Sequence, residues 1–225
     1  MAQKLILITG GYGHLGQALA QAFLGNGDRV ILTGRNEKKL AQTGRTLGCP
    51  AYPMDVKDFK NVAAVAKVIQ KKYGFLDVMI NNAAVFKSAP VSEMDSADFL
   101  EIIITNIYGP FICVQKFLPL LRESAQPLIV NIASTSGHRA DPGTCAYNAS
   151  KFGLLGFTES IAKELRKENI RVTSISPSSI HFGSTALSGK GIPLNGRDIA
   201  QTAVYIANSP GRTLFRDIEL WATNP

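Results

Sequence analysis

The sequence predicts an α/β protein in which a doubly wound parallel sheet carries helices on both faces. Short apolar runs of strand length alternate with helical stretches along the whole chain, which is the pattern of β–α–β units. A glycine-rich turn, Gly10–Gly16, joins the first apolar run to the first helical stretch. No internal repeat, low-complexity tract or linker divides the 225 residues, so we expect a single domain over 1–225.

The first half of the chain is expected to supply four strands and three helices. Its apolar runs are short and nearly continuous, as expected for strands buried on both faces. Gly27 and Gly74 end the first and third helices, and Asn36 is a good N-cap for the second. The expected strands are Leu5–Thr9, Val30–Thr33, Ala51–Met54 and Leu76–Ile80; the expected helices run from the glycine-rich turn to about Asn26, from Asn36 to Thr46 and from Asp58 to Tyr73.

The second half continues the alternation. Asp95 caps a long helix, Asp98 is placed for the reciprocal contact of a capping box, and Pro110 is expected to bend that helix. The expected helices are Asp95–Leu121, Thr144–Lys167 and Asn195–Asn208, and the expected strands are Leu128–Ala133, Val172–Ile175 and Thr213–Trp221. Ligands of such sheets bind at the carboxyl ends of the strands, where the strand order reverses.

Composition indicates an ordinary globular protein with enough apolar residues for a sizeable core, at 45% hydrophobic and 18% charged residues. No apolar run reaches the roughly 20 residues that a membrane span needs. The start of the chain is more typical of a first strand than of a signal peptide, so we expect a cytoplasmic location. The three cysteines and three histidines are scattered, which indicates neither a disulfide framework nor a metal site.

A formal net charge of +7 raises the question of nucleic acid. The basic residues are spread along the chain and form no basic–aromatic stripe, so no nucleic-acid partner is expected, although a DNA-binding protein stays open as an alternative. A small ligand that bears phosphate would benefit from the same positive field.

The glycine-rich turn is suited to a pyrophosphate. Gly10 permits the tight turn, Gly13 lets the backbone approach the ligand, and Gly16 allows close packing of helix on strand. The helix N-terminus then offers free N–H groups and the positive end of its dipole. This Rossmann-like turn is expected to bind a dinucleotide through Gly10, Tyr12, Gly13, His14, Leu15 and Gly16.

The end of the second strand indicates which dinucleotide. An acidic residue there would bind a ribose 2′-hydroxyl, but the sequence carries no carboxylate and has Arg35 just beyond. Arginine suits a 2′-phosphate, so NADP is favoured over NAD, with Thr33 and Asn36 as further hydrogen-bonding groups. The alternative is a solvated arginine at the start of a helix.

Tyr147 and Lys151 form the candidate catalytic pair. Residues four apart lie on one face of a helix, so both side chains can point into one space. A phenol with a pKa near ~10 exchanges protons poorly at neutral pH, whereas an adjacent cation lowers that pKa. The pair alone is weak support, because a surface helix with a half-buried tyrosine has the same pattern.

Five motifs together resemble the short-chain dehydrogenase/reductase family. They are the Thr-Gly turn, the Asn-Asn-Ala-Ala stretch from Asn81, Asn106, Ser134, and the Tyr147/Lys151 pair, in that family's order and at about its spacing. The resemblance covers Lys4–Trp221, and chain length favours the shorter-chain branch. It implies an NADP(H)-dependent oxidoreductase that interconverts a carbonyl and a secondary alcohol, mainly as a reductase.

The resemblance also implies roles for single residues. Tyr147 would protonate the substrate oxygen, Lys151 would hold the nicotinamide ribose and lower the pKa of Tyr147, and Ser134 would orient the carbonyl. Asn106 would hold a water that links Lys151 to solvent. The remaining cofactor-binding residues would be Asp55 at the adenine, with Val56, Asn82, Ala83, Pro177 and Ile180. In the alternative, Ser134 or its neighbour Ser136 only satisfies backbone groups, and Asn106 only bridges a helix irregularity.

The chain departs from the family pattern in three places. His14 stands where shorter-chain members usually carry glycine, Ser178 replaces the glycine of Pro-Gly, and Phe182 replaces a threonine that meets the carboxamide. Ser184 or Thr185 could take over from that threonine. The segment 178–194 is expected to form a short substrate lid.

These departures leave a second functional hypothesis open: a catalytically weak NADP-binding sensor or scaffold. Under either hypothesis the family resemblance suggests a homodimer or homotetramer, with the helices that begin at Asp95 and Thr144 as interfaces. The substrate is expected to be a small-molecule carbonyl or alcohol that the sequence does not identify.

Overall fold

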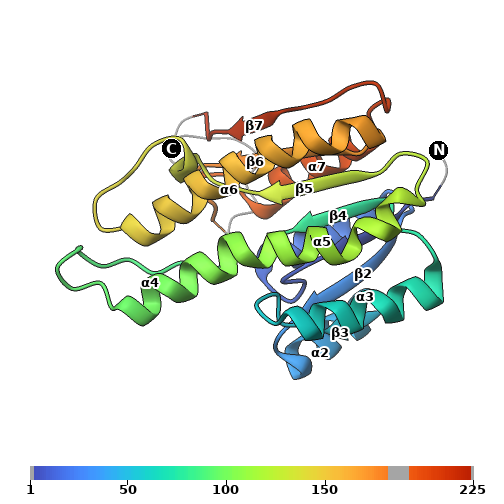
Figure 1. Cartoon of the computed structure of the whole chain (residues 1–225), viewed down its shortest axis with the longest axis horizontal. Coiled ribbons are helices and arrows are strands. Elements are labelled where there is room, and N and C mark those ends of the chain that lie inside the picture. Colours follow the sequence, from blue (N-terminus) through green and yellow to red (C-terminus); the bar gives the residue numbers. More distant parts are fainter. Residues whose placement is uncertain (1–2, 182–192, 224–225) are drawn as a thin grey trace.

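Seven parallel strands form the centre of the protein in the order β3-β2-β1-β4-β5-β6-β7, with helices on both faces (Figure 1). This computed structural model describes residues 3–181 and 193–223. The strand order runs outward from β1 on one side and from β4 on the other, so the reversal lies between these two strands. The predicted single-domain, doubly wound parallel sheet is confirmed.

The strands agree with the predicted runs within a few residues, apart from the last. They are β1 (Leu5–Ile8), β2 (Arg29–Gly34), β3 (Ala51–Pro53), β4 (Val78–Asn81), β5 (Leu128–Ile132), β6 (Arg171–Pro177) and β7 (Asp217–Leu220). β7 is shorter than the predicted Thr213–Trp221, because only residues 217–220 pair with β6 and Thr213 instead closes a turn onto Pro210.

The helices divide between the two faces of the sheet. They are α1 (His14–Gly25), α2 (Glu37–Leu47), α3 (Phe59–Tyr73), α4 (Ser96–Ile103), α5 (Gly109–Arg122), α6 (Cys145–Leu165) and α7 (Gly196–Asn208). Figure 1 shows α3, α5 and α6 in front of the sheet, where Ile69, Phe117 and Leu165 share one apolar core. α1, α2 and α7 contribute Phe23, Leu40, Ile199 and their neighbours to the core on the other face.

Most predicted helix ends are confirmed. Asn36, Asp58, Asp95 and Asn195 all accept backbone N–H bonds as N-caps, and Gly27 and Gly74 have positive φ at the ends of their helices. The capping box predicted for Asp98 is wrong, because that carboxylate pairs with the Lys87 ammonium instead. A capping box is present at α7, where Asp198 accepts from the backbone N–H of Asn195.

The predicted long helix is continuous from Ser96 to Arg122 but changes its hydrogen-bonding pattern at 104–108, where one π-helical turn joins α4 to α5. Gly109 donates its N–H to the carbonyl of Ile104, five residues back, and Pro110 follows without an N–H to donate. The irregularity that the sequence placed at Pro110 is therefore a π turn just before it.

By length and composition the helix Ser96–Arg122 is able to cross a membrane, with a mean hydropathy of 1.4 over its best window and 44% of that window buried inside the protein. The core helix of a soluble protein meets the same criteria, and α5 contributes Ile112, Phe117 and Leu120 to the core. The helix is therefore weak support for a membrane span.

Candidate active site

A cavity of about 770 Å³ lies at the carboxyl ends of the strands, beside the reversal between β1 and β4. It is lined by the residues that follow six of the strands. The predicted residues that line it are Gly10, Tyr12, Gly13, His14, Leu15, Gly16, Arg35, Asp55, Val56, Asn82, Ala83, Ser134, Tyr147, Lys151, Pro177 and Ile180. Among the described residues, Asn106 and the two further hydrogen-bonding groups Thr33 and Asn36 were predicted for the site but do not line it.

The glycine-rich turn is built for a close approach of the backbone. Gly10 has φ +65°, and a Cβ on Gly16 would meet the Gly10 carbonyl oxygen at 2.4 Å. α1 has no side-chain N-cap, and His14, Leu15 and Gly16 of its first turn line the cavity. The first turn of α1 can therefore direct N–H groups at a phosphate, which fits a dinucleotide.

Asn82 holds this turn against the end of β4. Its backbone N–H donates to the Thr9 hydroxyl at 3.0 Å, and its amide donates to the Thr9 carbonyl at 2.8 Å. The Ala83 N–H donates to the same hydroxyl at 3.0 Å. The Asn-Asn-Ala-Ala stretch thus joins β1 and β4 at the edge where their order reverses.

The end of the cavity near β2 and β3 carries the groups expected at an adenosine. The Tyr12 ring lies over Gly34, where an added Cβ would meet a ring carbon at 2.7 Å. The Arg35 guanidinium is half exposed, with its Nη1 3.5 Å from the Glu101 Oε1. Asp55 accepts from the backbone N–H of Lys57 at 3.0 Å, so its second oxygen remains available to a ligand.

Lys151 is buried at the other end of the cavity. Its side-chain Nζ donates to the Ile132 carbonyl at 2.7 Å and lies 5.5 Å from the centre of the Tyr147 ring. Burial lowers the pKa of Lys151 to about 8, because no carboxylate among the described residues offsets the lost hydration. The helical spacing of the pair places both side chains in the cavity as predicted.

The predicted effect of Lys151 on the tyrosine pKa is not seen in this structure. Burial raises the pKa of Tyr147, and a hydrogen bond with Ser134 opposes that rise. The Lys151 ammonium is directed at the Ile132 carbonyl, and the ring of Phe86 packs edge-on against Tyr147 at 4.9 Å. Desolvation therefore outweighs the hydrogen bond with Ser134.

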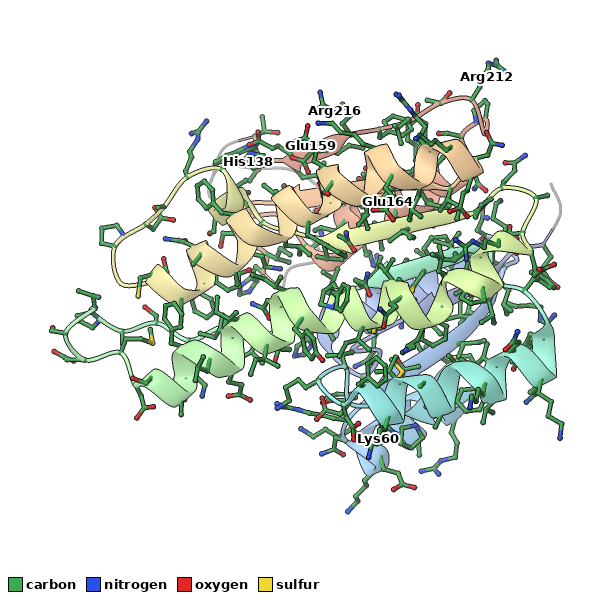
Figure 2. All side chains as sticks on the ribbon, in the orientation of Figure 1. Lys60, His138, Glu159, Glu164, Arg212 and Arg216 are labelled. Carbon is green, nitrogen blue, oxygen red and sulfur yellow. The ribbon has the colours of Figure 1, made fainter. Side chains whose placement is uncertain are left out.

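Ser134 and Ser136 both line the cavity, and Ser134 is the partner of Tyr147. The Ser134 hydroxyl also accepts from the Ser136 backbone N–H at 3.1 Å, so it satisfies a backbone group as well. The loop that follows β5 and carries both serines contacts β7 through His138, whose Nε2 lies 2.8 Å from the Asp217 Oδ2. Figure 2 shows His138, Glu159 and Arg216 along this border of α6 and β7.

Asn106 lies in the π turn and does not contact Lys151 directly. Its amide accepts from the Val85 N–H at 2.8 Å and donates to the Val85 carbonyl at 2.9 Å and to the Ser150 hydroxyl at 3.0 Å. Ser150 in turn donates to the Tyr147 carbonyl at 2.7 Å. The side chain thus bridges the helix irregularity to α6, which is the alternative considered from the sequence.

Several lining residues were not predicted. Phe86 and Thr105 adjoin predicted motifs, and the position of Thr105 next to Asn106 was the available signal. The Thr105 hydroxyl is buried and has no hydrogen-bond partner among the described residues. Glu101 meets Arg35 only in the folded chain, where a residue of α4 lies beside the residue that follows β2, and no local pattern indicated this contact. Phe182, Ser184, Thr185 and most of the predicted lid 178–194 lie outside the described residues.

Comparison with known proteins adds a family match and several relatives. Residues 4–190 match the family model described as short chain dehydrogenase. An uncharacterised oxidoreductase of Staphylococcus aureus is 30% identical over 223 residues, which covers 97% of this chain and 96% of the relative. A similar protein of Staphylococcus epidermidis is 28% identical over 222 residues.

Solved structures share the fold at lower identity. Levodione reductase superposes with a TM-score of 0.88 at 21% identity, covering 97% of this chain and 96% of its own. A 3-ketoacyl-(acyl-carrier-protein) reductase of Brucella melitensis, solved with NADH, also gives 0.88 at 22% identity, with 98% and 97% covered. An alcohol dehydrogenase of Thermococcus sibiricus, solved with 5-hydroxy-NADP, gives 0.86 at 20% identity, with 100% and 98% covered.

Proposed function

The chain belongs to the short chain dehydrogenase family of oxidoreductases, and we propose that it is an NADP(H)-dependent enzyme that interconverts a carbonyl and a secondary alcohol. The observation that carries the proposal is the cavity itself. One end presents a phosphate-binding turn and Arg35, and the other end brings together Ser134, Tyr147 and Lys151. Reduction is the proposed direction in the cell.

The cofactor would supply the hydride when bound, and the chain's own residues would manage the oxygen of the substrate. In reduction, the carbonyl carbon gains hydride while the Tyr147 hydroxyl transfers its proton to the oxygen. The Ser134 hydroxyl would donate a hydrogen bond to that oxygen and fix its position. Burial raises the pKa of Tyr147 and keeps the phenol protonated before hydride transfer, so proton donation depends on stabilising the tyrosinate that forms.

Lys151 would act on the proton donor through position and charge. Its buried Nζ lies near the Tyr147 ring, and the Ile132 carbonyl holds it in place. An anionic or polar ligand in the cavity would favour the charged ammonium, and the cation would then stabilise the tyrosinate left after proton transfer. Asn106 would support this arrangement through Ser150, the residue before Lys151.

Arg35→Ala tests the choice of cofactor. The parent protein is expected to bind NADPH more tightly than NADH, because Arg35 can pair with the 2′-phosphate. The variant should lose most of that difference while its affinity for NADH changes little. Dissociation constants from nicotinamide fluorescence measure this directly; equal affinities for the two cofactors in the parent protein would defeat the NADP assignment.

We also propose a homodimer or homotetramer built on α4, α5 and α6. A set of large apolar side chains is exposed on these helices: Phe99, Leu100, Ile104, Tyr108, Phe111 and Phe152. Exposed apolar surface of this kind is typical of protein–protein interfaces. The family commonly forms oligomers, and the proposed interface uses the two helices expected from the sequence.

Leu100→Glu is expected to shift the protein towards monomer, because a carboxylate would have to be buried without a partner. Leu100 is 56% exposed, so the substitution should leave the fold intact. Light scattering at micromolar concentration gives the mass. Val68→Glu, at a position 48% exposed on α3, is the matched control. A monomeric parent protein would contradict the oligomer.

A further inference from the structure

A carboxylate from α4 pairs with two cations that line the cavity, Arg35 and Lys57. The Glu101 Oε1 is 3.5 Å from the Arg35 Nη1 and 4.0 Å from the Lys57 Nζ. The other oxygen, Oε2, is 3.0 Å from the Lys87 Nζ. Arg35 and Lys57 both line the cavity, so Glu101 already pairs with cations that a ligand anion would use.

The surrounding charges are nearly balanced. Lys87 also pairs with Asp98, so the cluster contains three cationic and two acidic side chains, a formal sum of +1. Lys87 and its cationic neighbours hold the pKa of Glu101 below its usual range, which keeps the carboxylate ionised at neutral pH. Glu101 is therefore a permanent negative charge beside Arg35.

The helix face that bears Glu101 points towards this end of the cavity. Thr105 lies one turn further along the same helix and lines the cavity. Its hydroxyl is buried and has no protein partner in the described part of the chain. A nucleotide that reaches Thr105 therefore lies one helical turn from Glu101.

A 2′-phosphate and the Glu101 carboxylate would bind the same guanidinium. The sequence lacks an acidic residue at the end of β2, but the tertiary structure supplies one from α4. A carboxylate repels a phosphate that binds the same guanidinium. It can instead accept a hydrogen bond from an unphosphorylated ribose hydroxyl. Glu101 therefore opposes the preference for NADP over NAD that Arg35 creates.

We propose that Glu101 is a specificity-determining residue that competes with the 2′-phosphate of NADP for Arg35 and Lys57 and thereby narrows the difference in affinity between NADP(H) and NAD(H). The inference rests on the proposed function, since it requires a nicotinamide dinucleotide with its 2′ position at Arg35. The Arg35 and Glu101 side chains are 52% and 29% exposed, so their interaction has the strength of a surface ion pair. The expected effect on cofactor affinity is therefore moderate.

Glu101→Gln tests this with little change in shape. We expect the dissociation constant of NADPH to fall about fivefold, while that of NADH changes less than about twofold or rises. Asp98→Asn is the matched control, because it removes a negative charge from the same cluster at a residue that pairs with Lys87 and not with Arg35. It should change the NADPH-to-NADH ratio by less than about twofold.

Nicotinamide fluorescence titrations at low and moderate salt provide the readout, with thermal unfolding as a check that each variant is folded. An NADPH-to-NADH ratio that is unchanged in Glu101→Gln, with a parent that binds NADPH, would overturn the role of Glu101 alone. The role of Glu101 would also be overturned if Asp98→Asn changed the NADPH-to-NADH ratio as much as Glu101→Gln does. A parent protein that binds neither dinucleotide would overturn the proposed function and this inference with it.

Discussion

Tyr147→Phe is expected to reduce kcat for carbonyl reduction by about 10²–10⁴-fold, because the substitution removes the proton donor and keeps the ring. The phenylalanine can retain the edge-on contact with Phe86 at 4.9 Å, so the shape of the cavity should persist. Affinity for NADPH is expected to change less than about twofold. NADPH consumption with a panel of carbonyl compounds and fluorescence titration of NADPH separate the two effects.

Tyr205→Phe is a suitable control, since that ring is 65% exposed on α7, away from the cavity and from the proposed interface. Near-full activity of Tyr147→Phe with intact NADPH binding would show that the proposed mechanism is wrong. A parent protein that binds NADPH and consumes none with any carbonyl compound would instead support the sensor or scaffold hypothesis.

Lys151→Met is expected to reduce kcat by about 10²-fold or more and at the same time to remove a pH dependence of stability. Burial lowers the pKa of Lys151 from 10.5 to about 8 in the folded protein. Below pH 8 the lysine is protonated in both states, and the folded state bears a cost of about 3 kcal/mol for the buried charge.

The sign follows from proton counting. Between pH 8 and 10.5 the unfolded chain still holds the proton that the folded chain has lost, so the stability of the parent rises with pH over this window. Between pH 8 and pH 10.5 the free energy of unfolding of the parent should therefore increase by about 3 kcal/mol relative to that of Lys151→Met. Urea unfolding at pH 7 and at pH 10 measures the difference.

Lys163→Met controls for general effects of removing a lysine, since that side chain is 71% exposed on the same helix. If the stability difference between the parent and Lys151→Met were constant from pH 7 to pH 10, the buried lysine would not have the low pKa that its surroundings imply.

Local patterns predicted the elements and most of the cavity. Asn36, Asp58, Asp95 and Asn195 were readable as helix starts because an N-cap depends on neighbours within three residues. The glycines of the first turn and the Tyr147/Lys151 spacing were readable for the same reason. Parallel strands then bring their carboxyl ends to one edge, so residues after different strands meet without further information.

The prediction for Asp98 is wrong because the carboxylate has a distant partner: it was placed for a capping box but pairs with Lys87, eleven residues earlier in the chain. The water link from Asn106 to Lys151 stays a prediction, and the bonds of the Asn106 side chain to Val85 and Ser150 were not indicated by the sequence. In each case the deciding group lies on another segment, and its distance depends on how that segment packs.

The sequence by itself determined the fold class, the family and many of the residues that line the cavity, because spacing along helices and strands dictates which side chains share a face. Only the tertiary structure decided the electrostatics. The low pKa of Lys151 and the raised pKa of Tyr147 come from burial, and the contact of Glu101 with Arg35 comes from α4 packing beside the end of β2. Desolvation and long-range charge depend on three-dimensional distances, which no spacing in the chain encodes.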